Sequence, residues 1–171
     1  DLEDGYAAVE MITELAKRLP DWRVLVNNAS VFDYDDAAEL NFENFVVAMV
    51  VNAASPLRMT QAFIVHAAAE GGKRVIQLTD QRLINPNPDF LSYAMSKHAL
   101  GASIPMMAMA CPDPDDRIYG LAPGASLPSF DQWASEHEVS GRLNLLERLP
   151  DPQELAQAAL WLSQGWLASG Q

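Results

Sequence analysis

The chain has 171 residues, and 11 Lys and Arg against 23 Asp and Glu give it a formal net charge of -12 at pH 7. This length suits one domain that buries a sizeable core, so we expect a single domain over residues 1–171. An acidic surface repels phosphodiester backbones and anionic membranes, which argues against nucleic-acid and membrane partners. The one cysteine and the lack of a long apolar run or a basic leader predict a cytoplasmic protein.

Helical and strand patterns alternate along the first half of the chain. Before Pro20, apolar residues recur at spacings of three and four, which predicts an amphipathic helix. Residues 23–26 are a short apolar run, typical of a buried strand. Residues 41–69 are again helical in pattern, with Pro56 marking a start or a kink.

The second half repeats this alternation. Residues 74–79 and 117–121 are predicted strands, and residues 90–111 are a predicted helix between them. The last predicted helix has Asp151 as its N-cap and Pro152 at its first position. Together these elements predict an α/β fold, a Rossmann-like, doubly wound parallel sheet with helices on both faces.

Polar segments follow all three predicted strands. These segments are residues 27–30, Thr79 with Asp80, and residues 122–126. Because right-handed crossovers bring the carboxyl ends of parallel strands to one edge of a sheet, we expect the three segments to meet at a ligand-binding cleft.

Tyr93 and Lys97 lie four residues apart in a predicted helix, so their side chains share one face. A phenol has a pKa of ~10 in water, and a nearby ammonium group would stabilise its phenolate form. Such a pair can act in proton transfer. Taken alone it is a weak signal, and an ordinary pair on a helix surface is the alternative.

Four features in this order and spacing resemble the short-chain dehydrogenase/reductase family. They are LVNNAS at residues 25–30, Asn52, the pair of Tyr93 and Lys97, and LAPGAS at residues 121–126. The resemblance implies that Tyr93 is the proton donor, and that Lys97 binds the cofactor ribose and lowers the pKa of the tyrosine. It also implies that Asn52 holds a water in a proton relay.

The same resemblance implies a nicotinamide cofactor at the edge of the sheet. Three residues after the first strand would stabilise the sheet beside it: Asn27, Asn28 and Ala29. Two residues after the third strand would lie against its nicotinamide end: Pro123 and Gly124. Asp1 would contact its adenine.

One position departs from the usual family pattern. Most members carry serine thirteen residues before the tyrosine, where this chain has Asp80. The pteridine reductases, and the similar dihydromonapterin reductases, have aspartate there, and it works with the tyrosine in delivering protons to a pterin ring. The sequence N-N-A-S followed by Phe32 resembles the same branch, in which the aromatic ring sandwiches the pterin against the nicotinamide. Ser30 would then lie near the cofactor phosphate or the substrate, and Ser126 near the cofactor pyrophosphate.

The glycine-rich turn of the family does not occur in the chain, and the resemblance places it upstream. We therefore expect a domain that lacks its first strands and its last strand. The residues that select the cofactor would also lie upstream, so NADPH is implied by the pterin branch alone, and NADH stays open.

The predicted function is NAD(P)H-dependent reduction of a dihydropterin-like C=N bond, with Tyr93 and Asp80 assisting protonation of the nitrogen. One alternative is a carbonyl or alcohol oxidoreductase of the same family, in which Asp80 takes the role of the serine. Another is a non-catalytic, nucleotide-binding regulatory homologue. By resemblance the partners are a small-molecule substrate and further copies of the chain, in a dimer or tetramer.

Other conspicuous residues have structural interpretations. The histidines have no carboxylate or cysteine partner at ligand spacing, so no metal site is predicted. The aspartates that follow Phe32 are interpreted as a solvated loop: Asp33, Asp35 and Asp36. Residues 125–147 correspond to the mobile lid of the family, where Phe130 or Trp133 would close the cleft or simply pack on the body.

Overall fold

A computed structural model describes residues 1–127, 139, 141, 144 and 146–171. Its centre is a parallel sheet with the strand order β1-β2-β3. The strands are β1 (Val24–Asn27), β2 (Arg74–Leu78) and β3 (Arg117–Leu121). Since the three strands run in the same direction and in close register, their carboxyl ends lie at one edge of the sheet.

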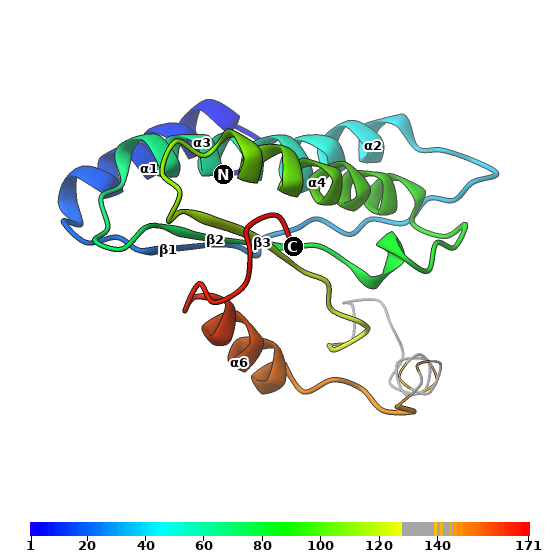
Figure 1. The fold of residues 1–171 in the computed structure, drawn as a ribbon. Coiled ribbons are helices and arrows are strands. Elements are labelled where there is room, and N and C mark those ends of the chain that lie inside the picture. Colours follow the sequence, from blue (N-terminus) through cyan, green and yellow to red (C-terminus); the bar gives the residue numbers. More distant parts are fainter. Residues whose placement is uncertain (128–138, 140, 142–143, 145) are drawn as a thin grey trace.

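Helices cover both faces of this sheet, as Figure 1 shows. On one face lie α1 (Gly5–Arg18), α2 (Phe42–Met49), α3 (Ser55–His66) and α4 (Leu91–Ala110). On the other face lies α6 (Pro152–Leu162). The predicted Rossmann-like α/β arrangement is confirmed. Within the described ranges, no helix combines the length and apolar character that crossing a bilayer requires.

The two faces of the sheet have separate cores. Val75 and Ile118 pack with Phe63 of α3 in the larger core, and all three side chains are fully buried. The next residue on each strand, Ile76 or Tyr119, points to the opposite face and packs there with α6. This alternation explains the consecutive apolar residues Val75-Ile76 and Ile118-Tyr119, since a sheet that is covered on both sides buries both faces of such a strand.

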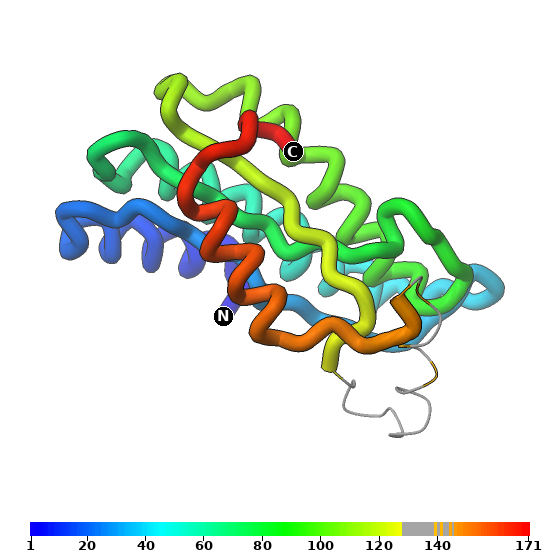
Figure 2. The backbone as a smooth tube through the Cα atoms, turned by 60° about the horizontal axis from the view of Figure 1, so that its bottom comes forward, coloured from blue at the N-terminus to red at the C-terminus, as the bar shows by residue number. Residues whose placement is uncertain are grey.

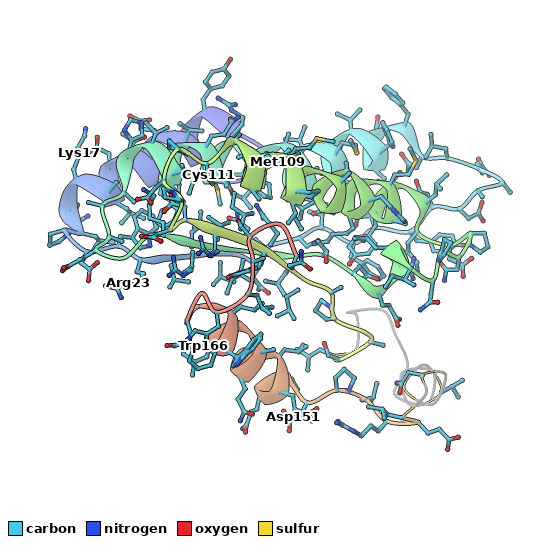
Figure 3. The ribbon with its side chains drawn as sticks, viewed as in Figure 1. Lys17, Arg23, Met109, Cys111, Asp151 and Trp166 are labelled. Carbon is cyan, nitrogen blue, oxygen red and sulfur yellow. The ribbon has the colours of Figure 1, made fainter. Side chains whose placement is uncertain are left out.

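The start of α6 agrees with its sequence signal. The Asp151 carboxylate accepts a hydrogen bond from the Gln153 N–H at 2.8 Å, and the Glu154 carboxylate accepts one from the Asp151 N–H at 2.9 Å. This capping box satisfies backbone donors that the helix itself cannot use. Asp151 and Trp166 lie at opposite ends of the segment that contains α6 (Figure 3).

The long predicted helix over residues 41–69 is instead three pieces. Between α2 and α3 the chain forms a π-helical turn, Val50–Ala54, and Pro56 lies in the first turn of α3. A π turn adds one residue to the local winding, and such turns occur frequently at functional sites. This turn carries Asn52.

The end of the chain runs beside β3, as Figure 2 shows. The Gly170 N–H donates to the Ile118 carbonyl at 2.8 Å, and the Gly120 N–H donates to the Gln171 carbonyl at 2.8 Å. The last residues therefore begin to extend the sheet. The sequence predicts that the last strand of the domain is missing. Gly170 and Gln171 pair with β3 at the place where that strand would begin.

Candidate active site

The segments that follow the three strands lie together, as predicted. The Thr79 N–H donates to the Leu121 carbonyl at 2.8 Å, and the Gln81 N–H donates to the Pro123 carbonyl at 3.0 Å. Asn27 in β1 donates to the side chain of its neighbour Gln77 in β2 at 3.0 Å. These bonds bring residues 27–30, 79–81 and 121–124 to one edge of the sheet.

Tyr93 and Asp80 form the central contact of this edge. The Tyr93 hydroxyl donates a hydrogen bond to Asp80 Oδ2 at 2.6 Å, while the Arg82 N–H donates to the other oxygen, Oδ1, at 2.8 Å. Asp80 directly precedes the short 3₁₀ turn η2 (Gln81–Leu83) and caps it, which fixes the carboxylate against the tyrosine. The thirteen-residue separation in sequence thus becomes direct contact.

The environment raises the pKa of Tyr93 above its ordinary value. Burial is the largest cause, followed by the hydrogen bond to Asp80 and the negative charge of that carboxylate, whereas Arg82 lowers the pKa. This direction is opposite to the lowering expected from Lys97. The phenol therefore keeps its proton at neutral pH and is available as a donor.

Lys97 is buried one turn further along α4. Its side chain is 3% exposed, and its Nζ donates to the Leu78 carbonyl at 2.8 Å and lies 5.7 Å from the centre of the Tyr93 ring. Burial lowers the pKa of Lys97 to about 8, and the Asp80 carboxylate opposes that shift. An ammonium group has three donors, and in the described part of the chain one of them is used. The other two suit a cofactor diol.

Asn52 connects the loop after β1 to α4. Its Oδ1 accepts hydrogen bonds from the Val31 N–H at 2.8 Å and the Ser30 hydroxyl at 3.0 Å. Its Nδ2 donates to the Val31 carbonyl and to the Ser96 hydroxyl, both at 3.0 Å. The Ser96 hydroxyl in turn donates to the Tyr93 carbonyl at 2.6 Å. Asn52 is therefore brought to the site, and its role in holding a water stays a prediction.

An aromatic group lies beside the tyrosine. The ring of Phe32 meets the Tyr93 ring edge-on at 4.6 Å between centres, and it stacks on Phe90 at 4.1 Å with an angle of 12° between the planes. Phe32 is 38% exposed. The predicted substrate-binding ring thus reaches the proton donor, but Phe90 already covers one of its faces.

Three neighbours of the site were not predicted to take part in it. The Arg82 guanidinium lies over the rings of Phe90, Phe32 and Tyr93, at 5.3, 5.8 and 5.9 Å from their centres. Phe90 is the second neighbour and Asp35 the third. No sequence pattern pointed to Phe90 or Asp35, because the contacts of Phe90 with Phe32 and of Asp35 with Ser92 join residues far apart in the sequence.

The interpretation of Asp35 as part of a solvated loop is wrong. Its side chain is only 4% exposed, and it accepts a hydrogen bond from the Ser92 N–H at 3.0 Å and another from the Ser92 hydroxyl. The adjacent Asp33 is exposed and agrees with the solvated interpretation.

The remaining predicted cofactor residues are less closely tied to the tyrosine. Asn28 and Ala29 are exposed just after β1, while Gly124 lies near the side chain of Gln81 and Ser126 is half-buried. Asp1 is exposed and accepts a hydrogen bond from the Glu3 N–H, and no contact in the described part of the chain joins it to Tyr93. Most of the predicted lid, with Phe130 and Trp133, lies outside the described residues.

Three comparisons relate this arrangement to known proteins. A family model described as enoyl-(acyl carrier protein) reductase matches residues 1–169. The 7alpha-hydroxysteroid dehydrogenase of Escherichia coli (strain K12) is 29% identical over 142 residues, which are 81% of this chain and 55% of that protein. The chain thus spans about half the length of this curated relative and of its counterpart from Escherichia coli O157:H7.

Two crystal structures resemble the whole chain. They are described as FolM alternative dihydrofolate reductase 1 with NADP, from Brucella canis and Brucella suis, and each is 27% identical. Both cover 100% of this chain, with TM-scores of 0.89 and 0.90, and the chain covers 67% and 68% of theirs. The family model over nearly all of the sequence, together with the shared fold and the Tyr93, Lys97 and Asn52 cluster, shows that the chain belongs to the short-chain dehydrogenase/reductase family.

Proposed function

We propose that the protein is an NADPH-dependent reductase that acts on the C=N bond of a dihydropterin-like substrate. The observation that carries this proposal is the 2.6 Å hydrogen bond between the Tyr93 hydroxyl and Asp80. A serine at the position of Asp80 could only orient a carbonyl oxygen. A carboxylate joined to a phenol can also exchange a proton with it, and the nitrogen of a C=N bond requires a proton when the hydride adds to the carbon.

The charges around Tyr93 favour proton delivery from the pair as a unit. If Tyr93 gave up its proton beside an ionised Asp80, two negative charges would lie in contact, which the raised pKa of Tyr93 already resists. The pair avoids this state when Asp80 itself carries a proton, because the carboxyl group then passes that proton to the phenol as the phenol protonates the substrate. Arg82 and Lys97 lie beside the ring and offset the remaining charge.

NADPH would supply the hydride when bound. Lys97 fits its ribose because the buried ammonium uses one of its three donors among the described residues, and the exposed residues 28–30 offer room at the end of β1. The two Brucella structures that resemble the whole chain contain NADP, which supports the same cofactor here. The assignment of Pro123, Gly124, Ser126 and Asp1 to this cofactor stays a prediction.

Phe32 suits a flat heterocycle. Its ring is 38% exposed and contacts Tyr93, so a planar substrate that packs against the exposed part of the ring would lie near the phenol. The description of the Brucella proteins as alternative dihydrofolate reductases points to the same substrate class.

A carbonyl or alcohol oxidoreductase is the second candidate. The relative named 7alpha-hydroxysteroid dehydrogenase, at 29% identity, favours it. In this case Asp80 would position the oxygen of the substrate, and the phenol alone would transfer the proton.

The experiment is oxidation of NADPH by the full-length protein with dihydrobiopterin or dihydromonapterin, beside a panel of ketones. We expect turnover of a pterin that falls at least tenfold in Asp80→Ser, with Asp33→Ser as the matched control in an exposed position. Ketone turnover that survives or improves in Asp80→Ser, with none of the pterins, would replace this proposal by the second candidate. Tight NADPH binding without any turnover, unchanged in Tyr93→Phe, would favour a non-catalytic regulatory homologue.

A further inference from the structure

Helix α4, which carries both Tyr93 and Lys97, begins without a cap of its own. Its N-cap residue is Phe90, whose side chain cannot accept a hydrogen bond. Phe90 also has φ 55° and ψ 49°, in the left-handed region that bulky residues avoid. A helix start that lacks a local acceptor leaves buried N–H donors unpaired unless another segment provides one.

Asp35 provides this cap from a distant part of the sequence. Its Oδ1 accepts the hydrogen bond of the Ser92 N–H at 3.0 Å, and its Oδ2 accepts that of the Ser92 hydroxyl. The backbone carbonyl of Asp35 accepts from the Phe90 N–H at 2.7 Å. Since Asp35 is 4% and Ser92 1% exposed, water cannot readily replace these bonds.

The same contacts join the loop of residues 31–37 to the start of α4. The Ala37 N–H donates to the Pro88 carbonyl at 3.0 Å, next to a bridge between Asp36 and Asp89. Phe32, three residues before Asp35, stacks on Phe90. A strained conformation persists when its surroundings over-determine it, and Phe90 is held by its N–H and by its ring.

We infer that Asp35 is a positioning residue for the reaction, which fixes the first turn of α4 and so sets the Tyr93 hydroxyl against both Asp80 and the ring of Phe32. The inference rests on the proposed function for its kinetic consequences. Within the described residues Asp35 bonds to Ser92 and Phe90, and we infer that it acts on the reacting groups through them. Its negative charge at a helix N-terminus adds to the effect, since the helix dipole is positive there.

The test compares Asp35→Ala, Asp35→Asn and Ser92→Ala in the full-length protein, with Asp33→Asn as the control from the same loop. Misplacing a catalytic group by about 1 Å costs on the order of 100-fold in rate. We therefore expect kcat of Asp35→Ala to fall about 10- to 100-fold, while KM changes less than about threefold. Asp35→Asn keeps one acceptor oxygen and should therefore retain much of the kcat that Asp35→Ala loses.

The pH profile separates positioning from mere stability. Burial and the bond to Asp80 raise the pKa of Tyr93, and Arg82 opposes them. A loosened first turn would weaken both raising causes, so the alkaline loss of kcat should begin at lower pH in Asp35→Ala than in the wild type. A profile and a kcat equal to those of Asp33→Asn would overturn the inference, as would equal losses in the alanine and asparagine variants of Asp35.

Amide hydrogen exchange tests the inference without a substrate. In Asp35→Ala and Ser92→Ala we expect faster exchange at residues 91–96 and unchanged exchange at residues 100–108. Wild-type exchange at residues 91–96 in both variants would overturn the inference. If the wild-type protein turned over no substrate, the proposed function would fail, and the exchange result would still decide whether Asp35 holds the helix.

Discussion

Replacing Lys97 by methionine should stabilise the cofactor-free protein at neutral pH. The ammonium group is buried against Tyr93 and makes one hydrogen bond to the Leu78 carbonyl within the described structure. A protein gains nothing in stability from burying such a charge. We interpret the buried charge as a cost retained for cofactor binding.

The magnitude follows from the pKa of Lys97. Its lowering from 10.5 to about 8 corresponds to about 3 kcal/mol of cost for the charged form. Methionine removes this cost and also loses the bond to Leu78, which is worth about 1 kcal/mol. We therefore expect Lys97→Met to raise the free energy of unfolding by about 2 kcal/mol at pH 7.

The lowered pKa of Lys97 fixes the sign with which the stability difference between the two proteins depends on pH. Below pH 8 the lysine is charged in the folded and unfolded states, so the cost is fully present. Above about 8 the folded state releases the proton first, and the stability of the wild type rises relative to that of Lys97→Met until about 10.5. The gap between the two proteins should therefore narrow by about 1 kcal/mol from pH 7 to pH 9.

Urea unfolding of both proteins without cofactor, at pH 7, 8 and 9, measures this gap. Lys17→Met is the control, because Lys17 is an exposed residue paired with Glu14 on the surface. A methionine variant that is less stable than the wild type at pH 7, with a difference that does not change with pH, would refute the reasoning.

Three further predictions follow from the same structure. Arg82→Met should lower the free energy of unfolding by about 1 kcal/mol because it loses the contact with the aromatic rings, and Arg82→Lys should lower it less. Urea unfolding that finds both variants as stable as the wild type would contradict this prediction. Asp151→Ala should cost about 1 kcal/mol by removing the N-cap of α6, whereas Gln153→Ala, which uses only its backbone in the cap, should change thermal unfolding little. Fluorescence titration should show NADPH binding weakening as the pH rises through about 8, since neutral Lys97 has one donor fewer, and Lys97→Met should bind weakly at every pH.

Local patterns sufficed for much of the fold. The strands, the α6 cap and the alternation of helices and strands depend on neighbours in sequence, and they appear where the patterns place them. The π turn around Asn52 was missed because an apolar helical pattern does not distinguish one extra residue in a turn. The resemblance also indicated Asp80 and Tyr93 together, and a direct hydrogen bond joins them in the structure.

Contacts between distant segments were not predictable in this way. In the sequence, Asp35 is one of several acids in a polar loop. Its burial depends on its contact with Ser92, 57 residues later, at the start of α4. Phe90 adopts a left-handed conformation that its residue type does not suggest. The pKa of Tyr93 is raised rather than lowered because burial and Asp80 outweigh the opposing charge of Arg82, an outcome that depends on three-dimensional distances.

The central claim is that Asp80 and Tyr93 deliver protons as one unit, and a double-mutant cycle tests it most directly. The measurement is kcat for pterin reduction by the wild type, Asp80→Asn, Tyr93→Phe and the double variant. When two residues act as a unit, replacing either one lowers the rate about as much as replacing both. We therefore predict that kcat of the double variant lies within about threefold of kcat of the less active single variant. Losses that multiply in the double variant would show independent roles and contradict the account.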